Sequence, residues 1–224
     1  MPRIPRVDVG DEVYHIINRA NARLPIFFHE RDYQLFELIL AAARERFDMR
    51  ILAYCLMPNH FHFVLYPHKD GDLQKFMQWI TLTHTQRWHS QNKTIGTGHL
   101  YQGRYKSFLI QSNDHLLSVI RYVEGNPLRA NLVKKAENWD FSSLSKRIFN
   151  HDLKEKILSQ WPIVEPVDYL NFVNTSMGND EQEKIRYCLN RGKPFGSDDW
   201  TSRMIGKYGL MATVRNRGRQ QVNI

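Results

Sequence analysis

The sequence predicts an α+β domain built on a ferredoxin-like antiparallel sheet, the type also found in RNA-recognition motifs, with helices on one face. Two observations carry this prediction. Segments rich in β-branched and aromatic residues alternate with segments whose apolar residues recur at helical spacing. Their order is strand, helix, strand, strand, helix, strand, and then one further helix. We expect the second face of the sheet to be free for a ligand or for that extra helix.

Each expected element has its own local signal. The first strand, Glu12–Arg19, is dense in β-branched and aromatic residues. The helix Arg31–Phe47 carries apolar residues three and four positions apart, and the turn dipeptide Pro58-Asn59 separates the next two strands. The elements expected in chain order are strand Glu12–Arg19, helix Arg31–Phe47, strands Arg50–Leu56 and Phe61–Tyr66, helix Leu73–His89, strand Tyr105–Gln111, and a helix that begins within Ser112–Asp114 and ends near Glu124.

The pattern loosens after about Arg147, where prolines and a Gly178-Asn179 turn punctuate the chain. We therefore divide the chain into residues 1–150, which form the sheet domain, and residues 151–224, a small helical appendage with a basic tail. The short helices expected in the appendage lie within Pro166–Asn174, Asp180–Asn190 and Asp198–Tyr208.

Composition narrows the possible partners. The 224 residues include 31 Lys and Arg against 23 Asp and Glu, a net charge of +8 that favours an anionic partner such as nucleic acid. The longest near-continuous apolar stretch, Phe36–Ala43, is far too short to span a bilayer, and the amino-terminal ten residues do not resemble a signal peptide. Two separated cysteines and the absence of a GxxxxGK[ST] loop predict a cytoplasmic protein without a nucleotide cofactor.

The triplet His60-Phe61-His62 begins an apolar strand. Residues two apart on a strand point to the same face, so both imidazoles can converge on one cation and leave coordination positions open, as a catalytic metal requires. The alternative is two half-buried histidines at a strand edge, because short motifs often arise by chance.

A second candidate feature lies on the helix that follows the fourth strand. At helical spacing, Tyr122 falls just outside the buried stripe and borders the sheet. Asn126 projects from the same side if the helix continues that far, although Pro127 disfavours helical conformation at Asn126. Taken alone, a tyrosine at this position is usually a packing residue.

Together these features resemble a known family, the single-tyrosine HUH transposases, and most closely the REP-associated branch. The matching strings are LMPNHFHFVL at 56–65, RYVEGNPLRA at 121–130, YHIINR at 14–19 followed by Phe27-Phe28, QGRYK at 102–106, GKPFG at 192–196 and RGR at 217–219. The resemblance covers about residues 10–145 well and the rest loosely.

The resemblance implies a metal-dependent endonuclease and strand transferase that acts on single-stranded DNA. His60 and His62 supply two ligands to Mg²⁺ or Mn²⁺, and Asn126 supplies the third. Tyr122 attacks a phosphodiester and forms a 5′-phosphotyrosine link with a free 3′-hydroxyl, which can later reverse the step. The implied substrate is a REP-like imperfect palindrome folded as a hairpin, with a short recognition sequence beside its stem.

One position departs from the family pattern. Relatives often carry a histidine two residues after the tyrosine, where this chain has Glu124 followed by Gly125. Glu124 is therefore an alternative carboxylate for the metal site, and the choice between Asn126 and Glu124 stays open.

Basic, aromatic and amide side chains near the motifs are the candidate DNA contacts, because guanidinium groups suit phosphates and aromatic rings stack on unpaired bases. They are Arg19, Asn21, Arg23, Arg104, Tyr105, Lys106, Arg129, Arg215, Arg217 and Arg219, the last three as a tail that could enter a groove of the stem.

Two other functions remain open. The first is a non-catalytic nucleic-acid-binding module on the same sheet, and the second is a nuclease in which the histidine pair activates water. Both leave the joint occurrence of the two motifs unexplained. For a transposase of this kind we expect a monomer rather than a dimer, associated with the bacterial nucleoid and not with a membrane.

Overall fold

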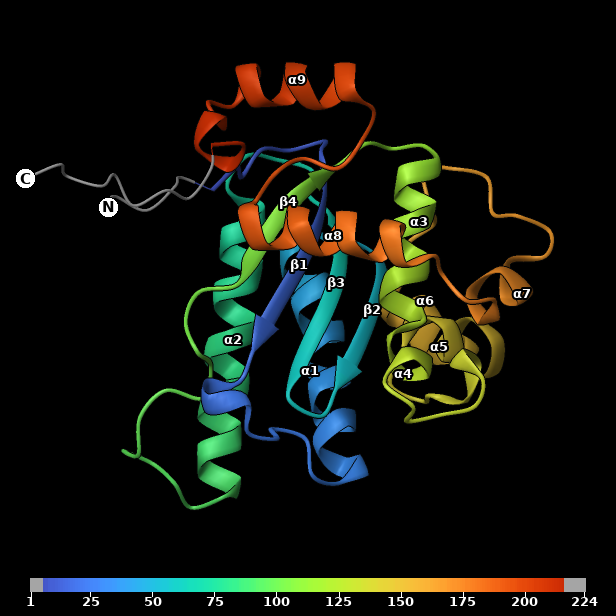
Figure 1. The fold of residues 1–224 in the computed structure, drawn as a ribbon. Helices are drawn as coiled ribbons and strands as arrows, with labels where there is room; N and C mark the ends of the chain where they lie inside the picture. The colour runs from blue at the N-terminus through green and yellow to red at the C-terminus, as the bar shows by residue number, and fades with distance from the viewer. Residues whose placement is uncertain (1–5, 216–224) are drawn as a thin grey trace, which may run out of the picture.

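The structure is a computed structural model that describes residues 6–215, and within them four strands form one antiparallel sheet in the order β2-β3-β1-β4 (Figure 1). The strands are β1 (Val13–Arg19), β2 (Arg50–Met57), β3 (His60–Tyr66) and β4 (Lys106–Ile110). Helix α1 (Glu30–Phe47) connects β1 to β2, and helix α2 (Asp72–Gln91) connects β3 to β4. This order and connectivity confirm the predicted ferredoxin-like class.

Helices α1 and α2 cover one face of the sheet (Figure 1). Aromatic residues that alternate along β3 point to this face, as the strand period requires. The ring of Phe36 on α1 lies 5.1 Å from that of Phe61, which in turn stacks on Phe63 at 4.5 Å. All three side chains are fully buried, so this face forms the larger core of the domain.

The opposite face is not left open. Helix α3 (Asp114–Glu124) packs against β2, β3 and β4, and helix α8 (Asn179–Arg191) crosses in front of the strands (Figure 1). Ile185 and Leu189 of α8 join an apolar cluster that also holds Val13 of β1 and Phe108 of β4. The extra helix α3 therefore covers this face, as the sequence allowed. It does so together with α8, a helix of the carboxy-terminal part.

Two helices near the predicted boundary were not expected from the sequence. They are α5 (Ser143–Phe149) and α6 (His151–Ile157). The side chains of Ser142 and Asn150 cap their amino-terminal ends. Both helices are short and polar, so they bury too few apolar residues to give a clear helical period. The other elements are α4 (Asn126–Arg129), α7 (Tyr169–Asn174), α9 (Asp198–Lys207) and the 3₁₀ turns η1 (Asn21–Arg23), η2 (Ala136–Asn138) and η3 (Met211–Thr213).

The carboxy-terminal helices α7 and α9 lie within the stretches where the sequence predicted helices, and α8 extends one residue beyond its predicted stretch at each end. No helix among residues 6–215 has the length and apolar character needed to cross a membrane.

Candidate active site and cation site

The histidine pair lies on β3, on the sheet face that α3 and α8 cover. The rings of His60 and His62 are 5.0 Å apart between centroids. Burial lowers the pKa of His60 to about 4, assisted by the charge of Arg19, which pairs with His60 across the strands. Burial also holds the pKa of His62 well below its usual range. Both rings are therefore neutral at pH 7, the protonation state in which imidazole binds metals.

Tyr122 reaches this pair from α3. Its ring stands edge-on to His62, with centroids 5.9 Å apart, and only 6% of the residue is exposed. The helix is fixed here because Leu116, Val119 and Val123 are fully buried against the sheet. The stripe-edge position predicted for the tyrosine thus brings it beside the histidines, on segments sixty residues apart in the sequence.

The chain after Tyr122 turns sharply. Helix α3 ends at Glu124, and α4 begins at Asn126 with Pro127 in its first turn. The side-chain amide nitrogen of Asn126 is buried and has no hydrogen-bond partner among the described residues. The guanidinium of Arg129 folds back over the ring of Tyr122, 4.5 Å from its centroid, and donates to the Tyr122 carbonyl oxygen.

These residues fit a divalent cation with open coordination positions. His60 and His62 offer two neutral imidazoles, and Asn126 has a buried side-chain amide whose nitrogen has no hydrogen-bond partner among the described residues. Among residues 6–215, no three His, Cys, Asp or Glu side chains gather so as to hold a metal by themselves. A cation here would take its other ligands from water or from substrate oxygens, as catalytic sites do.

Glu124 does not belong to this set, which corrects the alternative drawn from the sequence. Its carboxylate is fully buried and accepts hydrogen bonds from the Ser143 and Tyr169 hydroxyl groups. Arg147 lies 3.9 Å from the same carboxylate. Glu124 therefore links α3 to α5 and α7 through buried hydrogen bonds.

His15 was not singled out from the sequence. It lies on β1, fully buried, with Nε2 2.9 Å from Nδ1 of His62 and its ring stacked on His62 at 5.1 Å. The Tyr122 ring lies 6.1 Å from it. A histidine on an apolar strand gives a weak signal by itself, and only the β1–β3 register places it diagonally across from His62.

Three of the candidate DNA contacts lie together beside the histidine pair. Arg19, Arg104 and Lys106 line one cleft where β1 ends and β4 begins. Asn190 of α8 lines the same cleft, and its side-chain oxygen accepts a hydrogen bond from Lys106 at 3.1 Å. The helix that covers the sheet therefore also forms one wall of this basic cleft.

The remaining candidates divide by exposure. Asn21 and Arg23 are exposed in η1, where the Arg23 carbonyl accepts from Asn59. Tyr105 is 8% exposed and lies under the Arg6 guanidinium, 4.1 Å from its ring centroid, so it presents no open face for a base. This removes Tyr105 from the exposed candidates.

Two further outcomes concern arginines. Arg129 is engaged with Tyr122, as described above, and is not a free surface charge. Arg215 is exposed and its carbonyl accepts from Arg191, while Arg217 and Arg219 lie outside the described residues.

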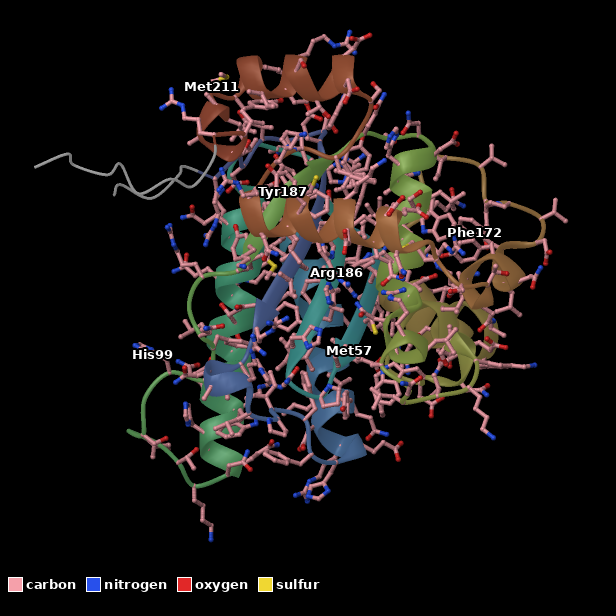
Figure 2. All side chains as sticks on the ribbon, in the orientation of Figure 1. Met57, His99, Phe172, Arg186, Tyr187 and Met211 are labelled. Carbon is pink, nitrogen blue, oxygen red and sulfur yellow. The ribbon has the colours of Figure 1, made fainter. Side chains whose placement is uncertain are left out.

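Arg186 of α8 is a second residue that the sequence did not indicate. Figure 2 shows its side chain over the sheet, on the side where Met57 ends β2. Its charge lowers the pKa of Arg129, a smaller effect than the burial of Arg129 itself. The charges of Arg129 and Arg19 also lower the pKa of His62, after the larger effects of its burial and of the neighbouring histidines. The positive charge near the histidine pair suits an anionic phosphodiester.

A tyrosine beside a histidine pair on a ferredoxin-like sheet defines the class of single-tyrosine HUH proteins. Residues 9–126 match the model of the family described as IS200-like transposases, and the chain belongs to this family.

Two individual proteins agree with the predicted REP-associated branch. A Haemophilus influenzae protein that carries the name REP-associated tyrosine transposase is 21% identical over 121 residues, which span 50% of this chain and 66% of the relative. The solved structure of a REP-associated tyrosine transposase bound to a REP hairpin matches with a TM-score of 0.54 and 16% identity, over 79% of this chain and 95% of the other. The predicted resemblance is confirmed, and the solved structure supports the fold.

Proposed function

We propose that this chain is a metal-dependent endonuclease and strand transferase that cleaves single-stranded DNA at or near hairpin-forming, REP-like palindromes through a 5′-phosphotyrosine intermediate. The observation that carries the proposal is the position of Tyr122, edge-on to His62 at 5.9 Å. A nucleophile and a cation site must lie this close for both to act on one phosphodiester.

In this proposal Tyr122 is the nucleophile. A phenol is mostly protonated at neutral pH and needs a cation or a base nearby to react as phenolate. Arg129 supplies a permanent positive charge against the ring, because a guanidinium stays protonated in proteins. The phenol of Tyr122 gives its proton to water, and its oxygen forms a bond to phosphorus as the bond from phosphorus to the 3′-oxygen breaks. The released 3′-oxygen takes a proton from water to become the free 3′-hydroxyl.

His60, His62 and Asn126 are the residues that would hold Mg²⁺ or Mn²⁺. When bound, such a cation neutralises charge on the phosphate oxygens and on the leaving 3′-oxygen. The reverse attack by the 3′-hydroxyl restores a phosphodiester, so the covalent link preserves the bond energy and the reaction needs no nucleotide cofactor.

The basic cleft of Arg19, Arg104 and Lys106 is the proposed path of the DNA strand, because it opens beside the histidine pair. The hairpin substrate follows from the REP-associated relatives, one of which was solved with a REP hairpin. The exposed residues Asn21 and Arg23 extend this basic surface in the loop after β1.

The test uses a single-stranded hairpin from DNA flanking the gene, labelled at its 3′ end and incubated with Mn²⁺ or Mg²⁺. A denaturing gel should show label attached to the protein, and the adduct should be absent with Tyr122→Phe and with His62→Ala. Cleavage that leaves no adduct and that persists in Tyr122→Phe would instead indicate that the histidine pair activates water. Binding without cleavage, repeated with a randomised hairpin library, would indicate a non-catalytic binding module.

A further inference from the structure

Both histidines of the pair have the same ring nitrogen engaged by a neighbouring side chain. Nδ1 of His60 lies 2.7 Å from Oδ1 of Asn59, and Nδ1 of His62 lies 2.9 Å from Nε2 of His15. Engagement of one ring nitrogen decides which tautomer a neutral imidazole adopts, and therefore which nitrogen can bind a metal.

The amide orientation of Asn59 fixes the tautomer of His60. Its nitrogen Nδ2 donates to the Arg23 carbonyl at 3.0 Å, so its oxygen Oδ1 is the atom that faces His60. An oxygen can only accept, and Nδ1 of His60 must carry the proton. Nε2 of His60 then keeps its lone pair.

The contact between His15 and His62 allows two arrangements. If His15 donates, His62 carries its proton on Nε2 and cannot bind a cation through that atom. If His62 donates from Nδ1, its Nε2 keeps the lone pair, and His15 carries its own proton on Nδ1. Nδ1 of His15 is buried without a partner in either arrangement. A cation at Nε2 of His62 selects the second arrangement, because it needs the lone pair of that atom.

The surroundings of His15 hold its ring in place. The residue is fully buried, stacked on His62 with an interplanar angle of 13°, and packed against Phe108 at 5.0 Å. Its Nε2 already contacts His62, so His15 is not placed to be a third ligand through that atom.

We propose that His15 and Asn59 are positioning residues that hold His62 and His60 by Nδ1, so that both Nε2 atoms are presented to the cation. This rests on the proposed function, because it takes the histidine pair as the metal ligands. Asn59 also ties His60 to the exposed loop that contains Arg23, and so connects the cation site to a proposed DNA contact.

The first experiment measures Mn²⁺ binding by the full chain, from the electron paramagnetic resonance signal of the free ion. His15→Leu removes the acceptor, and His15→Gln replaces it with an amide oxygen. We expect His15→Leu and Asn59→Ala to weaken Mn²⁺ binding about 10–100-fold, and His15→Gln to retain most of the affinity. His84→Leu is the matched control, because His84 is equally buried but bonded to Tyr101 on the other side of the sheet.

The second experiment reads the tautomers directly. Ring ¹⁵N signals of histidine-labelled protein, with saturating Mg²⁺, should show His60 and His62 protonated on Nδ1. A proton on Nε2 of either ring, or unchanged Mn²⁺ affinity in His15→Leu and Asn59→Ala, overturns the positioning roles and leaves the proposed nuclease intact. Failure of the unaltered protein to bind Mn²⁺ overturns the metal-dependent function, and the positioning proposal with it.

Discussion

The guanidinium of Arg129 lies 4.5 Å from the centre of the Tyr122 ring and donates to the carbonyl oxygen of the same residue. One side chain thus holds both the ring and the backbone of the proposed nucleophile. Gly125 makes this possible, because a Cβ at that position would lie 2.9 Å from Nη1 of Arg129. The role of the glycine is therefore to give space to the arginine, since its φ of −81° is accessible to any residue.

Gly125→Ala should displace Arg129 without disturbing the fold. The new Cβ would also lie 3.0 Å from the Arg121 carbonyl oxygen, and the flexible arginine is the group that can move. We expect the rate of adduct formation at saturating hairpin to fall about 10–100-fold, because a fixed charge beside the nucleophile is lost. The melting temperature should change little.

Gly206→Ala in α9 is the matched control, because nothing lies within 4 Å of the added methyl group. Arg129→Met should reproduce the loss seen with Gly125→Ala. If both variants form the adduct at the unaltered rate, Arg129 does not assist Tyr122.

The sheet and the histidine pair were predictable because their signals are local. The strand period places His60 and His62 on one face, and the helical period places Tyr122 at the edge of a buried stripe. The joint occurrence of these two motifs indicated the family. None of this required knowledge of contacts between distant segments.

Contacts between distant segments account for what was missed. His15 acquires its position beside His62 only from the β1–β3 register. Arg186 acts on the charge of Arg129 only because α8 crosses in front of the sheet (Figure 1). The sequence predicted Tyr105 to be an aromatic residue accessible to DNA, but its ring packs in the core and under the Arg6 guanidinium. Such positions depend on tertiary packing that a single sequence does not encode in any short pattern.

Glu124→Ala should destabilise the protein without weakening the cation site. The substitution leaves the Ser143 and Tyr169 hydroxyl groups and the Arg147 guanidinium without their buried acceptor. We expect a loss of about 3 kcal/mol in the free energy of unfolding, measured by urea denaturation. Glu124→Gln, which keeps the shape and one acceptor, should lose less. Weaker Mn²⁺ binding by Glu124→Gln at unchanged stability would instead place the carboxylate at the cation.

His84 should make the fold sensitive to acid. Burial lowers its pKa from 6.5 to about 3. The folded protein therefore binds fewer protons than the unfolded chain between these values, and the free energy of unfolding falls as the pH drops from 6.5 towards 3. One such group contributes a slope of about 1.4 kcal/mol per pH unit inside the window.

Urea denaturation at several pH values measures this slope. His84→Gln removes the titrating group and should flatten the dependence by about that amount. His99→Gln, at an exposed loop position, should leave it unchanged (Figure 2). Equal slopes for the unaltered protein and His84→Gln would mean that His84 titrates normally in the folded state.

The apolar cluster that contains Tyr122 joins the sheet to α8, and it predicts that the two parts of the chain unfold together. Ile185 of α8 is fully buried in the same cluster as Val13 and Phe108 of the sheet. Ile185→Ala should cost about 2–5 kcal/mol and lower the temperature of a single transition, seen equally by calorimetry and by amide exchange in β1 and α8. Leu82→Ala, at an exposed position of α2, should change little. Two separate transitions, with only one shifted by Ile185→Ala, would show that the parts on either side of residue 150 fold independently. Helix α8 would then be able to unfold from the sheet face that carries the histidine pair while the sheet stays folded.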